Sequence, residues 1–427
     1  MSILIGVIVL FLVLVTFHEY GHYSVARYFK IKILKFSVGF GPDLINWKNK
    51  DGIKFSLSAI PFGGYVAFHD PSDTLNYNQL SSEDKKYVLA NRPALERSLV
   101  TLAGPFFNFV LAFIIFAFVG FFMPRESDVV SAKFLDSNQE KIYRVLNVNN
   151  IPIKNAQELE IELFKNSGFT GRFEIDLFDY ENQREFSVFK DVDNLSFPQD
   201  QSPSSFFNLQ PFVDYSPVIS SVSENSIAFQ SGLRTGDLIK IINDKDVYST
   251  IQTNNILNEY GQRFYISVIR GEDNLNFALP AKREGEFFGI SLIPERNNFY
   301  DSLSYGFDQT IFWISNTFKF LVRTFTGSLS LDNLSGPVGI AKVAGDSLSS
   351  GLIPYLLLLA ILSISLGAFN LLPLPMLDGG QFLFILVEEL KGSPINLKLK
   401  AALFNLSYLL IIALTIYVII NDVGRII

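Results

Sequence analysis

Four stretches of apolar residues are long enough to cross the hydrocarbon core of a bilayer, which takes about 20 helical residues. They cover residues 3–26, 99–123, 352–376 and 402–420. This pattern predicts a polytopic α-helical membrane protein with four transmembrane helices.

The charged residues between these stretches indicate how the chain is oriented in the membrane. Residues 27–97 contain eleven Lys or Arg and seven Asp or Glu, whereas residues 125–296 contain seventeen and twenty-six. Cytoplasmic loops carry an excess of Lys and Arg, although this rule weakens for long loops. We therefore expect residues 27–97 and the Lys-containing connection 378–401 on the cytoplasmic side, and the acidic block on the far side.

A β-hairpin is predicted in the first cytoplasmic loop. Apolar and polar residues alternate over residues 53–58, residues 61–64 have the composition of a turn, and residues 65–68 form the returning strand. Its free edge could pair with an extended peptide by strand addition, or the hairpin could only cover the protein's own surface. His69 follows it and is expected at the surface, not as a metal ligand.

The acidic block, residues 125–296, is predicted to contain two domains, because a pattern in its first half recurs in its second half. Residues 145–153 and 239–247 each contain a strand, an Asn/Asp turn and another strand, and residues 194–208 have the composition of a linker. Residues 231–237, Ser-Gly-Leu-Arg-Thr-Gly-Asp, resemble the signature of PDZ domains, which bind peptide ends. The first half lacks this signature, so we expect a degenerate PDZ-like domain there.

A long amphipathic helix is predicted after this block, because apolar residues recur every three or four positions with Lys319 and Arg323 alongside. It could lie in the membrane interface, brace the other helices or simply pack into the core. The apolar positions are Phe307, Ile311, Ile314, Phe318, Leu321 and Phe325.

Taken together, these patterns predict the order of the segments. It comprises a transmembrane helix (1–26), a cytoplasmic loop with the hairpin (27–97), a second transmembrane helix (98–123), PDZ-like domains (124–200 and 205–297), the amphipathic helix with connecting residues (298–350), a third transmembrane helix (351–377), a cytoplasmic connection (378–401) and a fourth transmembrane helix (402–421).

Composition narrows the class of protein. Of the 427 residues 48% are hydrophobic, 42 are Phe and the mean hydropathy is +0.27, which is too apolar for a purely soluble protein. The chain has no Cys, so any zinc must be held by His, Asp or Glu. The net charge of −7 argues against a nucleic-acid partner.

The candidate chemistry begins in the first apolar stretch, with His18-Glu19-Tyr20-Gly21-His22. Histidines at i and i+4 lie on one face of a helix and can reach one metal ion, while Glu19 can handle a water molecule beside it. A signal peptide is the alternative, but the stretch lacks a charged start and a convincing cleavage site. Ionisable residues within a membrane span are costly, and the chain has only three His, so we favour a metal site.

Asp378 is the candidate third ligand. Pro373 and Pro375 interrupt the end of the third apolar stretch, and Asp378 follows at its cytoplasmic end, at a depth similar to that of His18 and His22. Two His, one carboxylate and an open position are what a catalytic zinc requires, although such ligands also bind other divalent metals. The alternative is that Asp378 only caps a turn before Gly379-Gly380.

These motifs together resemble the site-2 protease family of intramembrane zinc metalloproteases. The resemblance is carried by residues 18–22 and 370–379, and residues 39–42, 61–66, 102–109 and 334–341 match further motifs of its bacterial regulator of sigma-E protease branch. The resemblance implies that His18, His22 and Asp378 bind Zn²⁺, that Glu19 is the general base and that Asn370 holds the substrate backbone or the developing oxyanion.

The resemblance also implies that the hairpin, with Gly63, Gly64 and Tyr65, presents an extended substrate strand. Ser365 departs from the family pattern, in which an Asn contacts the substrate, and Gln381 replaces a His found in some relatives.

The function implied is cleavage of single-span membrane proteins, such as an anti-sigma factor already cut on its outer side or remnant signal peptides. The enzyme would lie in a bacterial inner membrane, with the PDZ-like domains periplasmic and the active site near the cytoplasmic face. Two alternatives remain open: a catalytically idle scaffold that binds peptide ends through its PDZ domains, and a zinc-dependent transporter.

Overall fold

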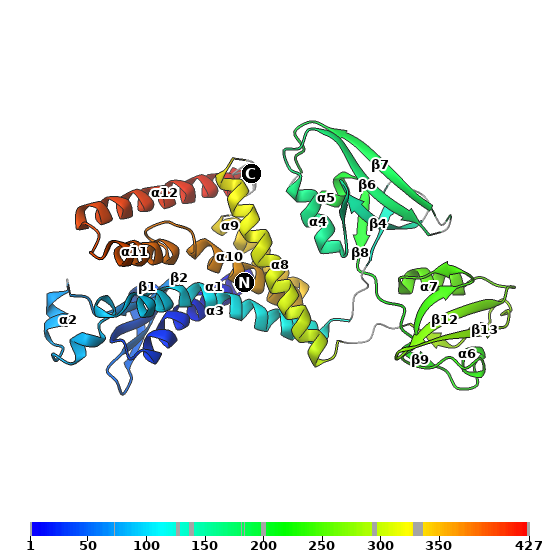
Figure 1. Cartoon of the computed structure of the whole chain (residues 1–427), viewed down its shortest axis with the longest axis horizontal. Coiled ribbons are helices and arrows are strands. Elements are labelled where there is room, and N and C mark those ends of the chain that lie inside the picture. Colours follow the sequence, from blue (N-terminus) through cyan, green and yellow to red (C-terminus); the bar gives the residue numbers. More distant parts are fainter. Residues whose placement is uncertain are drawn as a thin grey trace. The chain divides into compact units, whose positions relative to one another are not determined.

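The computed structural model describes residues 2–71, 73–124, 129–135, 141–180, 182, 184–197, 202–292, 297–327 and 336–424. The chain divides into two compact units. One contains Met1–Gly120 together with Phe299–Ile427, and the other contains Phe121–Asn298. The first unit carries long apolar helices and a small sheet, and the second carries two larger sheets (Figure 1).

Four described helices are long and apolar enough to span a membrane, which confirms the predicted number. They are α1 (Ser2–Tyr28), α3 (Ala94–Phe122), α10 (Leu352–Asn370) and α12 (Leu397–Gly424). The third helix was predicted to continue to residue 377, but it ends at Asn370 because Pro373 and Pro375 cannot continue it. The predicted connection 378–401 contains a further helix, α11 (Asp378–Lys391).

The first loop does contain a hairpin, but its strands are not the predicted ones. It is formed by β1 (Ile33–Lys48) and β2 (Lys54–Phe68). Ser37 of β1 lies opposite both Ser56 and Tyr65, so the first part of β1 separates the two segments that were expected to pair. The prediction missed β1 because Gly39, Gly41 and Pro42 interrupt its alternating pattern.

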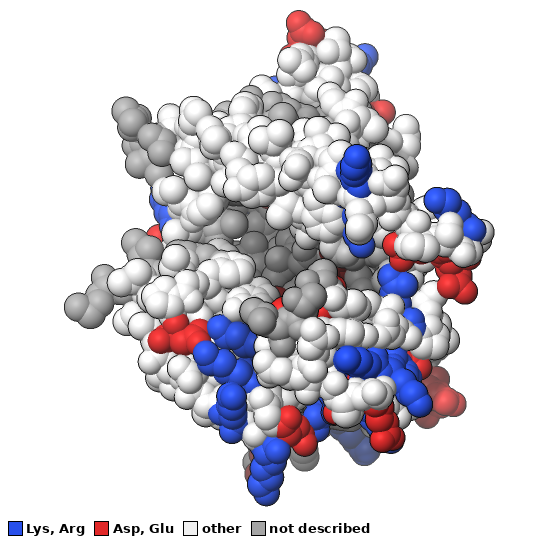
Figure 2. Space-filling model, turned by 90° about the vertical axis from the view of Figure 1, so that its left-hand side faces the viewer, with Lys and Arg blue, Asp and Glu red and all other residues white. Residues whose placement is uncertain are grey.

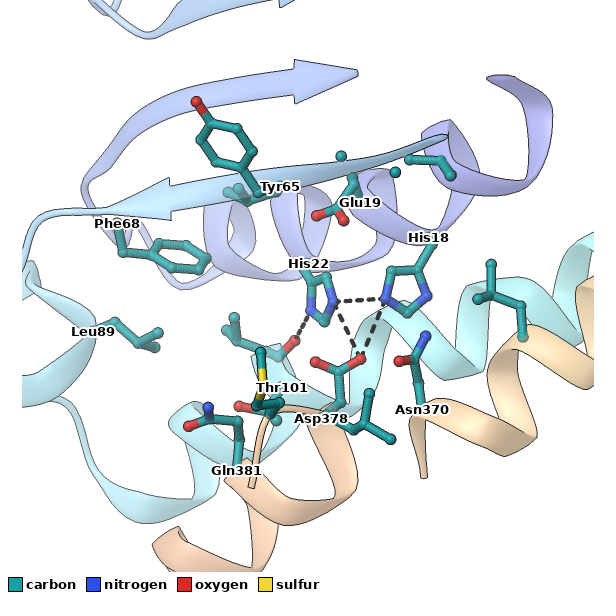
Figure 3. Close-up of a pocket in the computed structure, with 18 of the residues that line it drawn as sticks. His18, Glu19, His22, Tyr65, Phe68, Leu89, Thr101, Asn370, Asp378 and Gln381 are labelled. Carbon is teal, nitrogen blue, oxygen red and sulfur yellow. Dashed lines mark hydrogen bonds and ion pairs between the residues drawn. The ribbon is translucent and has the colours of Figure 1, made fainter. Parts of the chain in front are cut away.

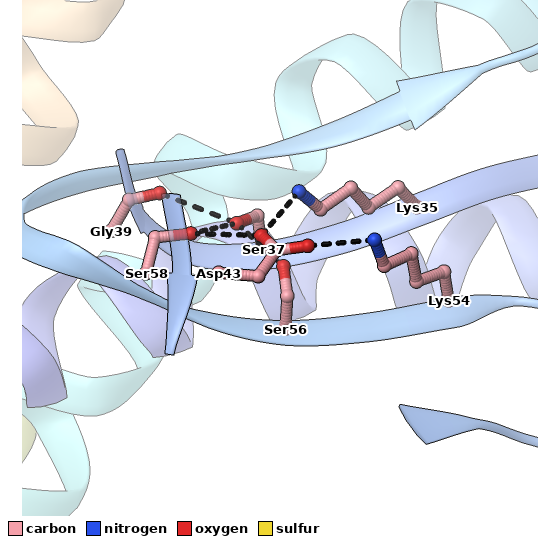
Figure 4. Close-up of polar contacts among 7 residues, drawn as sticks. All are labelled: Lys35, Ser37, Gly39, Asp43, Lys54, Ser56 and Ser58. Carbon is pink, nitrogen blue, oxygen red and sulfur yellow. Dashed lines mark hydrogen bonds and ion pairs between the residues drawn. The ribbon is translucent and has the colours of Figure 1, made fainter. Parts of the chain in front are cut away.

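A polar cluster lies inside this bent sheet (Figure 4). The Ser37 hydroxyl contacts those of Ser56 and Ser58 at 2.9 and 3.1 Å, and all three serines are buried. Asp43 accepts hydrogen bonds from Lys35 and Lys54 at 2.8 and 2.7 Å. The two lysines hold the pKa of Asp43 well below its ordinary range, so the strand segment around Asp43 is tied to its neighbours by ion pairs.

The remainder of this loop includes α2 (Thr74–Asn78) and two short 3₁₀ helices (Asp84–Tyr87 and Leu89–Asn91). Its lysines and arginines are interspersed with carboxylates on the face shown in Figure 2. Lys32 pairs with Asp84 at 2.6 Å, and Arg97 pairs with Glu388 of α11 at 2.9 Å. Many of the positive charges of the loop are thus locally compensated.

The predicted amphipathic helix is α8 (Phe299–Phe325), and the structure favours bracing among its three alternatives. α8 packs against α10 and lies against α3, where Gly306 fits closely onto Ala117 (Figure 1). Leu321 is buried, whereas Phe307 and Phe325 on the same apolar stripe are exposed. The helix therefore supports two of the membrane helices with only part of its apolar face.

α9 (Pro337–Ser350) packs against both α1 and α12. Its N-terminus is capped by the buried Asp422 of α12, whose carboxylate accepts the N–H groups of Gly336, Val338 and Gly339 at 2.9–3.1 Å. Farther along, α9 packs against Gly6 of α1. The family motif at residues 334–341 covers the start of α9, and its first two residues, 334 and 335, lie outside the described residues.

The first sheet of the second unit has the strand order β7-β6-β4-β3-β8, with β5 beside β4. The predicted linker 194–208 is wrong in its described part, because Leu195 and Phe207 belong to the core of this sheet domain. β8 also pairs with β3, so the domain extends beyond the predicted boundary at residue 200. Its elements are β3 (Val130–Phe134), β4 (Ile142–Val148), β5 (Ile151–Pro152), α4 (Ala156–Lys165), β6 (Gly171–Asp179), β7 (Arg184–Val192), α5 (Pro203–Phe206) and β8 (Leu209–Phe212).

The second domain contains a four-stranded sheet with the order β11-β10-β12-β13 and a two-stranded sheet of β9 and β14. Its elements are β9 (Ser221–Val222), α6 (Ile227–Gln230), β10 (Leu238–Ile242), β11 (Lys245–Asp246), α7 (Thr250–Leu257), β12 (Phe264–Arg270), β13 (Asp273–Leu279) and β14 (Ile290–Ser291). The predicted internal repeat is confirmed at its turns: Asn149-Asn150 and Asn243-Asp244 both have positive φ at both residues and join paired strands. The PDZ-like assignment of either domain stays a prediction.

Candidate metal centre

The two histidines of α1 lie on one face of a continuous helix, as the i, i+4 spacing predicts (Figure 3). Their Nε2 atoms are 3.3 Å apart, and the rings are roughly perpendicular. His18 and Glu19 are each 8% exposed. Burial of polar side chains within an apolar helix has an energetic cost, so this arrangement needs a compensating partner.

Asp378 supplies that partner from the first turn of α11. The chain reverses direction between α10 and α11, and Gly379 and Gly380 lie directly on the backbone of Leu371 and Leu374. A Cβ at either glycine would overlap a backbone carbonyl, so this reversal requires glycine at both positions. The close packing brings the Asp378 carboxylate up to the histidines.

The three side chains have the spacing of a metal site. Oδ2 of Asp378 is 3.3 Å from Nε2 of His18 and 3.6 Å from Nε2 of His22. Ligand atoms about 2.1 Å from a tetrahedral ion lie about 3.4 Å apart, which matches all three distances. Oδ2 is also buried without a hydrogen-bond partner among the described residues, as a ligand atom awaiting a cation would be.

Helix α3 supports this group from the other side. His22 donates a hydrogen bond from Nδ1 to the Val100 carbonyl at 2.8 Å, which leaves the lone pair of Nε2 available. Gly104 lies so close to both imidazoles that a Cβ there would overlap Nε2 of His22. Gly21 allows the same close approach from α1, because it lies on the Ala103 carbonyl.

A cavity of about 680 Å³ adjoins the three ligands, and every residue predicted for the site lines it. Glu19 and Asn370 lie beside the histidines and Asp378, whereas the Tyr65 ring extends away from them (Figure 3). Gly64 packs on Val15 and Glu19 with no room for a side chain. The bent sheet therefore lies directly against α1, the helix that carries both histidines.

Several other residues of this cavity were not among the predicted site residues. They come mainly from the sheet, α3 and the segment before α11, and they include Phe40, Thr101, Val100, Leu89, Met376 and Gln381. Gln381 donates to the Pro375 carbonyl at 3.1 Å, which steadies the reversal before Asp378. Ser365 donates its hydroxyl to the Ile361 carbonyl of its own helix. His69 is not among the residues grouped around a metal position.

The arrangement of two helix-borne histidines and a carboxylate inside a membrane bundle defines a class of metal-dependent membrane hydrolase, and sequence comparison specifies the family. A model of peptidase family M50 matches residues 6–414. The chain belongs to this family, the site-2 proteases, and is a zinc metalloprotease of that type.

Relatives extend over nearly the whole chain. A Haemophilus influenzae protein named "Regulator of sigma E protease" is 30% identical over 97% of this chain and 96% of its own. A Pasteurella multocida protein named "Putative zinc metalloprotease" is 30% identical over 98% of both chains. "Regulator of sigma-E protease RseP" of Escherichia coli is 26% identical over 97% of this chain and 96% of its own.

Proposed function

We propose that this protease cleaves single-span membrane proteins with a Zn²⁺ ion held by His18, His22 and Asp378. The observation that carries the proposal is the convergence of Nε2, Nε2 and Oδ2 at tetrahedral spacing, with Oδ2 lacking any other partner. When bound, the ion supplies Lewis acidity and lowers the pKa of a water molecule from about 16 toward about 7.

Glu19 is the proposed general base. Glu19 lines the same cavity as the three ligands, which is where a water molecule and the substrate would have to meet. It takes the proton of the attacking water and returns it to the amine that leaves. Asn370, at the last residue of α10, offers an amide to the substrate carbonyl.

The edge of the bent sheet is proposed to hold the substrate as an extended strand. Gly64–Phe68 pairs with Ile33–Val38 on one side, and its residues line the cavity. A helical substrate buries its carbonyls in its own hydrogen bonds, so it must unwind before cleavage. Pairing with this edge would replace the hydrogen bonds that the unwound substrate loses. This need supports substrate binding by strand addition over a sheet that only covers the protein's own surface.

The second domain is proposed to capture the end of a substrate that another protease has already trimmed. A groove of about 290 Å³ lies between α7 and the segment around β14. Lys282, 4% exposed, borders this groove and lies over the rings of Tyr260 and Phe288 at 4.8 and 5.1 Å. Burial lowers the pKa of Lys282, and a peptide carboxylate would complete its environment.

The substrates proposed are a membrane anti-sigma factor or remnant signal peptides, in keeping with the names of the relatives. The protein is an integral membrane protein with four candidate spans. We place it in a bacterial inner membrane, with the two PDZ-like domains in the periplasm and the metal centre near the cytoplasmic face, since the loop before α3 is the basic one.

A substrate-cleavage assay tests this function. Glu19→Gln keeps the shape of the side chain but removes its basicity, so cleavage of a single-span reporter in cells should fall at least about 1,000-fold. Zinc content of the purified variant should remain at the wild-type level. Cleavage at the wild-type rate would refute the role of Glu19, and wild-type protein with neither zinc nor cleavage would favour the idle scaffold.

A further inference from the structure

Asn108 is a buried polar residue of α3 that touches the metal centre from behind. It is 0% exposed, and its side-chain amide lies 3.1 Å from Nδ1 of His18. Two contacts from α10 fix its position: Ser363 donates its hydroxyl to the Asn108 backbone carbonyl at 2.8 Å, and Gly367 leaves little space beside its Cβ. The amide is thus held against one particular ring atom.

The contact decides which nitrogen of His18 carries the proton. In the orientation with Nδ2 of Asn108 toward the ring, Nδ1 of His18 is the acceptor and Nε2 must carry the hydrogen, which blocks metal binding. In the flipped orientation, Oδ1 accepts the Nδ1–H and the lone pair of Nε2 is free. In the first orientation, Oδ1 of Asn108 is buried without a hydrogen-bond partner among the described residues, and which orientation holds must be assigned from the hydrogen-bond network.

The metal centre itself selects the flipped orientation. Nε2 of His22 already offers a lone pair, because Nδ1 donates to the Val100 carbonyl. With the flip, three lone pairs from His18, His22 and Asp378 meet within 3.3–3.6 Å, which is unfavourable without a cation and favourable with one.

We propose that Asn108 is a positioning residue that holds His18 in its metal-binding tautomer by accepting the Nδ1–H at Oδ1. This inference rests on the proposed ligand set. It gives α3 the same role toward both histidines: the Val100 carbonyl orients His22, and the Asn108 side chain orients His18. Loss of such an outer partner typically weakens metal binding about 10- to 100-fold.

Three variants separate this role from simple space filling. Asn108→Leu keeps the volume but cannot accept the hydrogen bond, and Asn108→Ala removes both. Asn108→Asp keeps an acceptor at the same place. Tyr355→Phe is the matched control, because it removes a buried hydrogen bond from α10, to the Gly6 carbonyl, and leaves the contacts of Asn108 intact.

The measurements use full-length purified protein in detergent. Zinc affinity is determined by competition with a chromogenic chelator, and the Co²⁺-substituted protein is examined by its visible absorption spectrum. Asn108→Leu and Asn108→Ala should weaken zinc binding about 10- to 100-fold and alter the Co²⁺ spectrum. Asn108→Asp and Tyr355→Phe should stay within about threefold of wild type, with the wild-type spectrum.

The results distinguish this inference from the proposal on which it rests. Wild-type affinity in Asn108→Leu and Asn108→Ala would overturn the positioning role, and so would an equal loss in Asn108→Asp. If wild-type protein binds no zinc, or if His22→Ala retains it, the ligand set itself is wrong. A variant that does not fold is recognised by size-exclusion chromatography, and the remaining non-accepting variant then decides.

Discussion

The backbone of Gly104 in α3 lies against the imidazole of His22 in α1, with no space for a side-chain carbon between them. This contact sets how closely α3 can approach the metal centre. It also explains why the hydrogen bond from His22 to the Val100 carbonyl can form, since the two helices meet at glycine positions.

Gly104→Ala should therefore displace His22 and impair metal binding. The added methyl group overlaps Nε2, so we expect zinc affinity to fall roughly tenfold or more, with a similar loss of proteolysis. Gly120→Ala is the control, because Gly120 lies in the same helix but packs on Tyr305 of α8. It should lower thermal stability and leave zinc affinity unchanged. Equal zinc affinity in both variants would show that Gly104 has no special relation to His22.

The ion pairs of Asp43 predict a pH-dependent contribution to stability. Lys35 and Lys54 depress the pKa of Asp43 below its ordinary value of 3.8, so the folded state binds fewer protons than the unfolded state around that pH. The stabilisation is complete above 3.8 and is lost as the pH falls through the lower folded value.

Asp43→Asn tests this by thermal unfolding from about pH 7 to about pH 3. The wild type should be the more stable near neutral pH, and the difference should shrink below 3.8. Asp51→Asn is the control, because its pair with Arg27 is about half exposed and contributes little. A difference between Asp43→Asn and wild type that does not change with pH would contradict the account.

Asp422 should contribute to stability as the cap of α9. Its carboxylate accepts three backbone N–H groups, and replacing a capping carboxylate with Ala typically costs about 0.5–2 kcal/mol. Asp422→Ala should lower the melting temperature, and Asp422→Asn should restore most of the loss because Asn is also a good cap. An unchanged melting temperature in Asp422→Ala would exclude the capping role.

Because the buried Lys282 borders the groove of the second domain, we expect this groove to distinguish peptide ends by their charge. Short peptides with a free C-terminal carboxylate should bind the full-length protein more tightly than the same peptides with an amidated end. Lys282→Gln should abolish this difference, whereas Lys245→Gln on the exposed strand β11 should not. Fluorescence anisotropy measures both, and equal binding of both peptide forms to wild type would argue against end capture.

The parts of the site that depend on local spacing were predictable from the sequence. His18 and His22 are one helical turn apart, and Asp378 follows two prolines that end α10. The contacts that α3 makes with the histidines were not predictable from spacing. They involve Gly104 and Asn108 and depend on how two helices pack, not on the spacing within one of them.

Pairing and packing between distant residues were also not predictable in the bent sheet and in the second unit. The first part of β1 lies between two segments of β2, and this order depends on pairing between residues far apart in the chain. Leu195 and Phe207 lie in a stretch with the composition of a linker, yet they complete the core beneath the first sheet. The Ser, Pro, Gln and Asn residues of this stretch are typical of a linker. Composition alone does not show that a few apolar side chains within it are buried in the core.

The most direct test of the account is the zinc content of purified wild type and of the single variants His18→Ala, His22→Ala and Asp378→Ala, measured by mass spectrometry of the metal. The account predicts one zinc ion per wild-type chain and loss of stoichiometric zinc in each variant, since removal of one of three ligands leaves an incomplete site. Wild-type zinc content in any of the three variants would contradict it.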